Sequence, residues 1–495
     1  MMVNSKHDDI GNGRRGRMLA LAAALLGWLF DGFEMGLFPV ISRPALTELL
    51  SSRSGLAPAE LEKLVGLWNG IAIAAFLIGA AAGGVLFGWL GDRIGRVRAM
   101  SLSILTYALV SGLGAFVDSA WQIVFVRFVA ALGMGGEWSL GVALVMEVWA
   151  GRSRALIAGL IGAAANAGYA LVALLSLGLG NVRAIFGSWD LPASWVEWRL
   201  LMLCGVVPAL LTLFVRQFVP ESKTWQREKL EGSTSAWATR DLVGVLLGVL
   251  ACWGIIFLWS QPISLVYRML GTVPALIVAG GGYLYPVLRY LARTATQASQ
   301  SNQIVKRMLL GAILSGVPLL GTWAAVQWAP TWADQLSDKL PSAKAITQLC
   351  SAVGSIVGGF FGALLGGWLG RRTAYILLCC FSLASVLLFY QTNDVYGPWF
   401  LISVFLMGAF TASFYGWLPL YLPELFPTKV RATGQGFSFN FGRILAAIGA
   451  LQTGAIMGAF GSGYPQACSL MGSVYLLGLM IIWLAPETKN QPLPL

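Results

Sequence analysis

Apolar segments long enough to cross a membrane recur along the whole chain, and they constrain its fold more than any other feature. A transmembrane helix needs about 20 apolar residues, and fourteen stretches of the sequence meet that requirement. They lie near 18–41, 64–90, 99–117, 122–149, 155–180, 199–219, 241–260, 268–290, 308–330, 345–369, 373–390, 397–422, 433–458 and 467–485. The pattern predicts an all-α polytopic membrane protein with 14 transmembrane helices.

The composition supports this class and excludes several others. Hydrophobic residues make up 57% of the 495 and charged residues only 11%, whereas about a quarter of a soluble protein is charged. The net charge of +11 does not indicate nucleic-acid binding, because the basic residues fall in short loops between apolar segments. The six cysteines form no CxxC pattern, and the only histidine, His7, precedes the first apolar segment. We therefore expect no cofactor, no metal, no nucleic-acid partner and no enzymatic site.

The loop between the second and third apolar segments indicates the orientation. Residues 88–98 read GWLGDRIGRVR, and three arginines on so short a loop favour the cytoplasmic side. With residue 1 inside and alternating segments, most of the 33 lysines and arginines fall in inner loops. The apolar run that follows residue 17 is too long for a signal-peptide core. We therefore expect an uncleaved first span and cytoplasmic termini.

Three ordered matches indicate that the chain contains a duplication. The matches are GWLG at 88–91 and 367–370, Glu147 with Arg154 and Glu424 with Arg431 at equal spacing, and PESK at 220–223 with PETK at 486–489. Parallel repeats of this kind are typical of transporters. The expected division is a tail over 1–17, six-helix bundles over 18–219 and 308–485, a linker over 220–307 with two extra helices, and a tail over 486–495. The extra helices have uncharged cores, so we expect them at the periphery.

These motifs give the sequence a resemblance to the major facilitator superfamily over nearly its whole length. GWLGDRIGRVR resembles the signature loop of that family, and Arg127 with the glycines at 133, 135 and 136 resembles its second signature. PESKTW at 220–225 and PETK at 486–489 are similar to sugar-porter motifs. DGFE at 31–34 resembles aromatic-acid and sialic-acid proton symporters, and GGE at 135–137 resembles metabolite–proton symporters. The resemblance implies the major facilitator fold and alternating access.

Charged residues inside the apolar segments are the candidates for proton coupling. A charge at mid-bilayer costs about 2.5–3.5 kcal/mol on insertion scales, so Asp31, Glu34 and Glu137 need a cavity or a partner. Helical rise places Asp31 about 20 Å and Glu137 about 18 Å from the inner ends of their helices. Buried carboxylates can load and release a proton; the alternative is that they hydrogen-bond a neighbouring helix. Arg127 favours snorkelling or a gate ion pair, while the resemblance implies a part in proton-linked transport.

Arg443 is the leading candidate for substrate recognition. It is the deepest cation of the second half, about 15 Å from the inner surface, and a guanidinium can clamp a carboxylate through two hydrogen bonds. An ion pair with Asp92 or another carboxylate at an inner gate is the alternative. Further candidates for substrate contact are Asn166, Trp323, Gln327, Trp328, Trp332, Tyr415, Trp417, Asn440 and Gln452. Packing and interfacial anchoring are the alternative roles of the tryptophans.

Charges at the inner ends of the segments form a separate group. They are Asp92, Arg93, Arg96, Glu147, Arg154, Glu221, Arg371, Arg372, Glu424, Arg431 and Glu487. The resemblance implies interlocking ion pairs that hold the cytoplasmic gate closed while the protein faces outward. One surface pair is worth only about 0–1 kcal/mol, but a network can bias a two-state equilibrium. Positive-inside topology is the alternative, and it explains the arginines but not Glu147 and Glu424.

These features predict a secondary active transporter of a bacterial inner membrane. We expect proton-coupled symport of a small organic anion, such as a sialic, sugar or aromatic acid, by a monomer in the lipid bilayer. The sugar-porter motifs favour the alternative of a sugar or polyol porter, facilitative or proton-linked. A membrane enzyme or a sensor is a third possibility, but the sequence has no phosphate loop, metal cluster or long polar segment that would support either.

Overall fold

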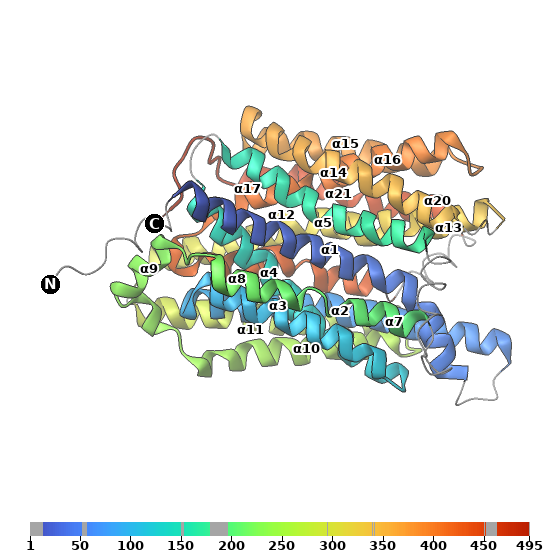
Figure 1. The fold of residues 1–495 in the computed structure, drawn as a ribbon, viewed down its shortest axis with the longest axis horizontal. Helices are drawn as coiled ribbons and strands as arrows, with labels where there is room; N and C mark the ends of the chain where they lie inside the picture. Colours follow the sequence, from blue (N-terminus) through green and yellow to red (C-terminus); the bar gives the residue numbers. More distant parts are fainter. Residues whose placement is uncertain are drawn as a thin grey trace.

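The computed structural model describes residues 13–51, 57–149, 153–178, 197–294, 296–338, 342–449 and 463–494, together with 340 and 451. Every regular element in these residues is helical. The long helices run side by side along one axis, and helix α1 begins at the same end of the bundle at which the chain finishes (Figure 1). Twelve of the described helices are long and apolar enough to cross a membrane. The chain is therefore a multi-pass membrane protein.

The first half contains seven described α-helices. They are α1 (Arg14–Ser51), α2 (Pro58–Ile94), α3 (Arg96–Leu113), α4 (Ala120–Val148), α5 (Arg154–Leu177), α7 (Glu197–Cys204) and α8 (Ala209–Phe218). Local sequence sets some of their ends. Ser119 and Gln122 form a reciprocal capping box at the start of α4, which satisfies backbone donors that a helix start leaves open. Gly95, with a φ of 112°, separates α2 from α3 because it can adopt a conformation closed to other residues.

The linker and the second half contain the remaining α-helices. They are α9 (Lys223–Leu230), α10 (Leu242–Ser260), α11 (Leu265–Arg293), α12 (Ala298–Ala324), α13 (Ala329–Leu336), α14 (Ala343–Leu369), α15 (Arg371–Gln391), α16 (Pro398–Ala412), α17 (Phe414–Tyr421), α18 (Arg431–Asn440), α20 (Tyr464–Gly472) and α21 (Val474–Ile481). Short 3₁₀ helices are η1 (Gly114–Phe116), η3 (Ser233–Ala236), η4 (Thr239–Asp241), η5 (Val326–Trp328), η6 (Leu422–Leu425), η7 (Thr428–Val430) and η8 (Ile482–Leu484).

The predicted count of fourteen spans is not confirmed. Two of the expected spans are absent from the twelve long apolar helices among the described residues. The segment 199–219 is divided into α7 and α8 by a turn at 205–208, where Pro208 lacks the N–H that a continuous helix uses. The segment 433–458 begins in α18 but extends over positions outside the described residues. Both therefore stay predictions as spans.

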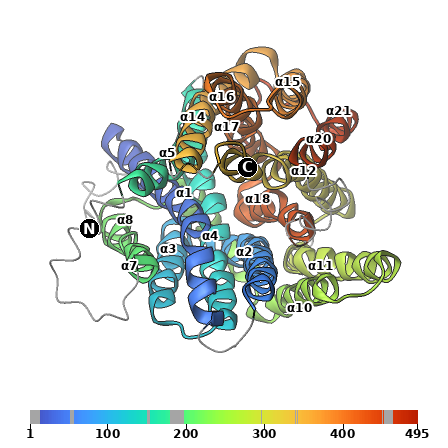
Figure 2. The same ribbon diagram turned by 90° about the vertical axis from the view of Figure 1, so that its right-hand side faces the viewer.

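The two halves meet most extensively where α5 packs on α14 and α2 packs on α18 (Figure 2), and α5 also contacts α17 while α4 contacts α18. Glycines permit the close approach of α2 and α18. A Cβ atom on Gly84 would lie 2.5 Å from the carbonyl oxygen of Gly436, and one on Gly436 would clash with the carbonyl of Gly84. The interface is therefore a backbone-to-backbone contact at this level, and its geometry fixes how the halves face each other.

The extra helices α10 and α11 form a peripheral hairpin beside α2 and α18 (Figure 2). Trp253 lies 5.3 Å from the ring of Phe128 in the first half, and Tyr283 lies 6.4 Å from the ring of Phe441 in the second. Only 11% of the most apolar 18-residue stretch of α11 is buried. The hairpin therefore contacts both halves while presenting a large apolar surface outward, as expected for helices that face lipid.

Candidate transport site and interlocked end

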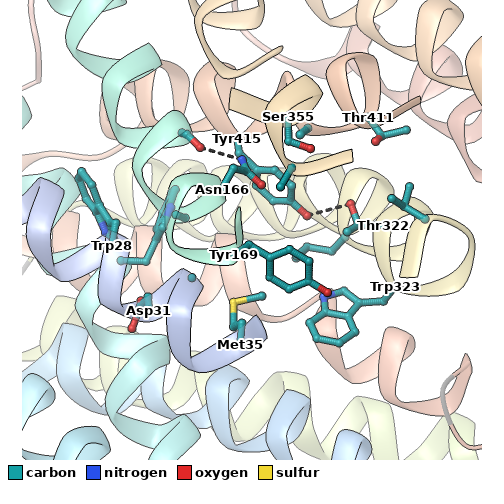
Figure 3. Close-up of a pocket in the computed structure, with 18 of the residues that line it drawn as sticks. Trp28, Asp31, Met35, Asn166, Tyr169, Thr322, Trp323, Ser355, Thr411 and Tyr415 are labelled. Atoms are coloured by element: carbon teal, nitrogen blue, oxygen red, sulfur yellow. Dashed lines mark hydrogen bonds between the residues drawn. The ribbon is translucent and has the colours of Figure 1, made fainter. Parts of the chain in front are cut away.

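A cavity lies between the two halves and takes residues from both (Figure 3). Its empty volume is about 1080 Å³ including its opening to solvent, which suits a small-molecule ligand. Its walls combine six aromatic side chains with eight polar or charged ones. The aromatic residues are Trp28, Trp138, Tyr169, Trp323, Tyr415 and Phe439. The polar residues are Asp31, Asn166, Thr322, Gln327, Ser351, Ser355, Thr411 and Arg443.

Arg443 reaches this cavity from the second half, just beyond the end of α18. Its side chain is buried, and the guanidinium lies 5.4 Å from the ring of Phe439. No carboxylate of the described residues lies within salt-bridge distance of it. Asp31 and Tyr415 interact with it electrostatically. Arg443 therefore does not form the gate pair with Asp92 that was the alternative, and its charge faces the cavity.

Asp31 reaches the same cavity from the first half, on α1. It is buried, and among the described residues its Oδ1 atom has no hydrogen-bond partner. Glu137 on α4 lies behind it and does not line the cavity. The carboxyl groups of Asp31 and Glu137 interact with each other, and Tyr107 on α3 interacts with both. The structure thus brings together two of the predicted coupling residues and adds a tyrosine that the sequence did not single out.

Glu34 and Arg127 form a separate buried pair that does not line the cavity. Arg127 Nη1 donates to Glu34 Oε1 at 2.7 Å, and the Ser111 hydroxyl donates to the same oxygen at 2.8 Å. The guanidinium also lies 4.3 Å from the Phe38 ring and 4.6 Å from the Phe76 ring. Arg127 is only 3% exposed, so the snorkelling interpretation is wrong. Its charge is compensated inside the first half.

The substrate-contact candidates divide into two groups. Asn166, Trp323, Gln327 and Tyr415 line the cavity, with Asn166 donating to the carbonyl of Gly162 (Figure 3). Gln327 accepts a hydrogen bond from the Tyr169 hydroxyl, and Tyr415 donates to Thr322, each at 3.0 Å. The first of these bonds crosses between the halves. The polar rim of the cavity is thus partly built from contacts that a change in the relative position of the halves would break.

Four of the tryptophan and asparagine candidates lie away from the cavity. Trp328 packs against Tyr464, and Trp332 packs among Phe389, Tyr390 and Phe400. Trp417 donates to the carbonyl of Arg371. Asn440 donates to the carbonyl of Gly135 at 3.1 Å, so it joins α18 to α4 across the halves. Gln452 lies outside the described residues.

Several cavity residues escaped the sequence prediction. Trp28 and Met35 flank Asp31 on α1, and Tyr169 follows Asn166 on α5 by three positions; these spacings place neighbours on one helix face and are a signal that could have found them. Trp138 and Phe439 stack across the halves with centroids 3.7 Å apart. No local pattern predicts that contact, because the two residues are far apart in the sequence.

The motif charges of the first half form one compact cluster at the end where α1 begins. Glu221 accepts hydrogen bonds from the backbone N–H groups of Arg96 and Val97, at 3.0 and 3.1 Å. The Arg96 guanidinium lies 3.3 Å from Glu147. Glu147 also accepts from the Ser222 hydroxyl. Glu221 therefore caps the start of α3, and burial raises the pKa of its carboxyl despite these donors.

The second half repeats this cluster residue for residue. Glu487 accepts from the backbone N–H groups of Arg371 and Arg372, at 3.0 and 3.1 Å. The Arg371 guanidinium binds Glu424 at 2.6 Å, and Thr488 donates to the same carboxylate. Although partial burial opposes ionisation, the backbone donors hold the pKa of Glu487 below its usual value. The duplication seen in the sequence is thus also a duplication of contacts.

Two reciprocal ion pairs join the clusters across the halves. Arg431 of the second half lies 2.8 Å from Glu147 of the first, and Arg154 of the first lies 3.4 Å from Glu424 of the second. Each glutamate therefore binds one arginine of its own half and one of the other. We call the residues of both clusters, together with Asp92, the interlocked end.

Asp92 has no carboxylate counterpart in the second half. When the positive-φ glycines Gly95 and Gly370 are matched, the position three residues earlier is Asp92 in the first half and Gly367 in the second. Its carboxylate accepts from the backbone N–H groups of Ala432 and Thr433 and from the Thr433 hydroxyl, at 3.3, 2.9 and 2.6 Å. Asp92 thus caps the start of α18 from the opposite half. The halves are joined asymmetrically at this point.

Arg93 and Arg372 belong to the predicted gate set, but within the described part of the chain neither forms a hydrogen bond or an ion pair across the halves. Arg93 donates to Thr239 of the linker at 2.7 Å. Arg372 donates through Nε to the carbonyl of Ala485 within its own half. The Arg93 side chain therefore lies beside the interlocked end, whereas Arg372 contributes to it through its backbone N–H and not through its charge.

Comparison with known proteins agrees with this architecture. The family model of the sugar (and other) transporters matches residues 19–244 and 373–495. A Haemophilus influenzae protein named for metabolite transport is 25% identical over 96% of this chain and 97% of its own length. A probable 4-methylmuconolactone transporter of Cupriavidus pinatubonensis is 27% identical, covering 94% of this chain and 90% of its own.

A solved structure of the proton:xylose symporter XylE, a major facilitator superfamily protein, aligns with a TM-score of 0.68 at 18% identity. The alignment covers 96% of this chain and 97% of XylE. This likeness shows the fold. Together with the family match over most of the sequence, it identifies the chain as a member of the sugar (and other) transporter family of the major facilitator superfamily.

Proposed function

We propose that this protein is a proton-coupled symporter of a small organic anion that works by alternating access. The observation that carries the proposal is the position of Arg443, a buried guanidinium that faces the cavity without a carboxylate partner among the described residues. Asp31 acts on Arg443 only from beyond salt-bridge distance, and a buried charge without a directly bound partner is costly. A ligand that brings its own carboxylate removes this cost, whereas a neutral ligand leaves it.

The rest of the cavity favours an acid with an apolar or planar body. Six aromatic side chains line it, and such surfaces bind flat or apolar groups through stacking and burial. The relative named as a 4-methylmuconolactone transporter supports an organic acid of this kind. Aromatic and related unsaturated acids are therefore preferred within the wider set of sialic, sugar and aromatic acids.

The coupling residues of the proposal are Asp31, Glu34, Glu137 and Arg127. Asp31 lies in the cavity, where its charge and that of Arg443 act on each other. Glu34 is held by Arg127 a turn further along α1. Protonation of a carboxylate next to the cavity can therefore be linked to occupation of Arg443 by an anion.

The interlocked end serves in this proposal as the cytoplasmic gate. Its ion pairs and the Asp92 cap join the halves at the end where α1 begins. They would break when the protein opens toward the cytoplasm. In the same proposal both termini lie in the cytoplasm, the membrane is a bacterial inner membrane, and the six-helix bundles over 18–219 and 308–485 are the moving units of a monomer.

A sugar or polyol porter is the second candidate. The family match and the XylE fold favour it, as do the polar side chains Asn166, Gln327 and Thr322 at the cavity, which can bind hydroxyl groups. This alternative gives Arg443 no direct ligand charge to bind.

The two candidates differ in the substrate that is taken up, and the facilitative form of the second also differs in needing no proton gradient. Purified protein in liposomes is offered benzoate, glucuronate, sialic acid and glucose, with and without an inward proton gradient. We expect the gradient to drive accumulation of an acid in the wild type and Asp31→Asn to abolish it while exchange persists. Equal glucose equilibration in both proteins, indifferent to the gradient, would establish the facilitative sugar porter and overturn the proposal.

A further inference from the structure

Three buried polar side chains from three helices meet behind the cavity wall. They are Asp31 on α1, Glu137 on α4 and Tyr107 on α3, and none is more than 8% exposed. Each of the three interacts with the other two. Only Asp31 also lines the cavity. The group therefore links the cavity to the interior of the first half.

Two glycines make this meeting possible. A Cβ atom on Gly27, one turn before Asp31, would clash with Glu137 Oε1. A Cβ atom on Gly133, one turn before Glu137, would lie 2.7 Å from the backbone nitrogen of Tyr107. The Glu137 side chain is thus laid against the bare backbone of α1, and α4 is brought against α3 beside Tyr107. The close approach of the helix backbones at these two glycines therefore brings the three side chains together.

Hydrogen-bond acceptors outnumber donors within this group when both carboxyl groups are ionised. Three carboxyl oxygens, Asp31 Oδ1 and both Glu137 oxygens, lack a partner among the described residues, as does the Tyr107 hydroxyl. An ionised carboxylate only accepts, whereas the phenol supplies one donor. Three acceptors therefore face one donor. A single added proton turns one acceptor into a donor, after which two donors meet two acceptors.

We infer that Asp31 and Glu137 hold one proton between them and that the Tyr107 hydroxyl, by donating to the other oxygen of Glu137, fixes that proton in place. The inference deepens the proposed symport function and rests on it for its consequence, although the shared proton itself does not depend on the substrate. Tyr107 is a positioning residue: it touches the proton-bearing group and not the cavity.

Other charged and titratable side chains surround the Asp31–Glu137–Tyr107 group, and the neighbouring Glu34–Arg127 pair is distinct from it. On α1, Glu34 is within interaction range but is bound by Arg127 and Ser111. Arg443 faces Asp31 from the second half. On α5 the titratable side chain that lines the cavity is Tyr169, which binds Gln327. On α2, Ala80 and Phe87 pack against α4.

This arrangement can couple the binding of an anion at Arg443 to protonation of the Asp31–Glu137 pair. An empty Arg443 offsets the charge that remains on the Asp31–Glu137 pair. An anion bound to Arg443 takes over that positive charge, so the ionised form of Asp31 loses its compensation. Anion binding and protonation of the pair therefore favour each other, and by linkage the effect is reciprocal.

The test is an infrared titration of purified protein without substrate, which follows the carbonyl band of protonated carboxyl groups against pH. We expect one titrating band that both Asp31→Asn and Glu137→Gln alter, because the two groups share the proton. Tyr107→Phe should displace the band and move its midpoint by about one unit toward higher pH, since a donor to the charged form is lost. The matched control is Tyr290→Phe, which removes another buried hydroxyl that has no hydrogen-bond partner among the described residues. It should change neither the position of the band nor its midpoint.

Two outcomes would overturn the inference. The first is a pair of independent bands, each removed by one carboxyl variant. The second is loss of the wild-type band on adding sodium chloride in place of choline chloride, because the group would then bind a metal cation. The titration contains no substrate, so it tests the shared proton separately from transport. Failure of acid uptake in liposomes would refute the symport proposal but not the shared proton. Two independent bands would refute the shared proton but not the symport proposal.

Discussion

Arg431 and Glu147 come from different halves of the chain and form an ion pair with 2.8 Å between Nη1 and Oε1, in which both side chains are only 1% exposed. Arg96 binds the same glutamate at 3.3 Å from within its own half. A surface pair of this kind would contribute little. Here the burial means that removing one partner leaves charge uncompensated, which makes the contact a sensitive point of the interlocked end.

Glu147→Gln is expected to destabilise the closed arrangement by about 3–5 kcal/mol, the usual cost of breaking a buried pair. The measurement is labelling by an impermeant maleimide of a cysteine introduced at Ala432, in a background without the native cysteines. Ala432 is fully buried beside Asp92, so labelling should become faster in the variant. Glu231→Gln, which removes an exposed pair with Arg227, is the control; equal labelling rates in both variants would contradict the role of Glu147.

Arg443→Gln is expected to weaken binding of the transported acid by about 10-fold to 100-fold, because a hydrogen bond to a charged group is worth about 1.5–3 kcal/mol. The loss should appear in the Kd from quenching of the tryptophans that line the cavity. Binding of a neutral analogue should stay unchanged. Arg240→Gln, on the exposed surface of the linker, serves as the control, and an unchanged acid Kd in Arg443→Gln would remove Arg443 from the binding site.

Gly84→Ala is expected to force α2 and α18 apart, because the added methyl would lie 2.5 Å from the carbonyl oxygen of Gly436. Overpacking of this kind costs about 1–3 kcal/mol. The thermal unfolding temperature in detergent should fall. Gly254→Ala on α10 meets no atom within 4 Å and should leave the temperature unchanged or raise it, as replacing glycine inside a helix does. A similar fall in both variants would show that helix packing at Gly84 is not the cause.

Ionisation of Glu221 and of Glu487 should change the stability of the protein with pH in opposite directions, although the two residues occupy equivalent positions. The pKa of Glu487 is held below its usual 4.5, so its stabilising effect is complete above pH 4.5 and is lost as the pH falls further. Burial raises the pKa of Glu221 above the same value, so its ionisation on raising the pH from 4.5 reduces stability.

The measurement is the thermal unfolding temperature of Glu221→Gln and Glu487→Gln at a series of acidic pH values, which gives the direction of each stability change. Relative to wild type, Glu487→Gln should become less stable as the pH rises, whereas the deficit of Glu221→Gln should shrink. Parallel curves for the two variants would show that the two clusters are electrostatically alike, contrary to the difference in burial.

The sequence by itself determined the class of protein, the duplication and the identity of the charged groups. Apolar length and the loop arginines are local properties, so they predict membrane helices without any tertiary contact. The match of Glu147 and Arg154 with Glu424 and Arg431 likewise survives as a repeated set of contacts. Asp31 and Glu34 were correctly recognised as buried charges because hydrocarbon requires a partner for them.

Only the tertiary structure decided which charges meet. Asp31 and Glu34 are three positions apart on one helix, yet Asp31 faces the cavity and Glu137 while Glu34 faces Arg127. Helix periodicity gives the direction of a side chain from its own axis but not the neighbour that lies there, which depends on packing between distant segments. The same limit explains why the sequence did not predict Tyr107 or the Trp138–Phe439 stack. It also explains why Asn440 and Trp328, which are a polar and an aromatic residue within apolar segments, were predicted to contact substrate but lie away from the cavity.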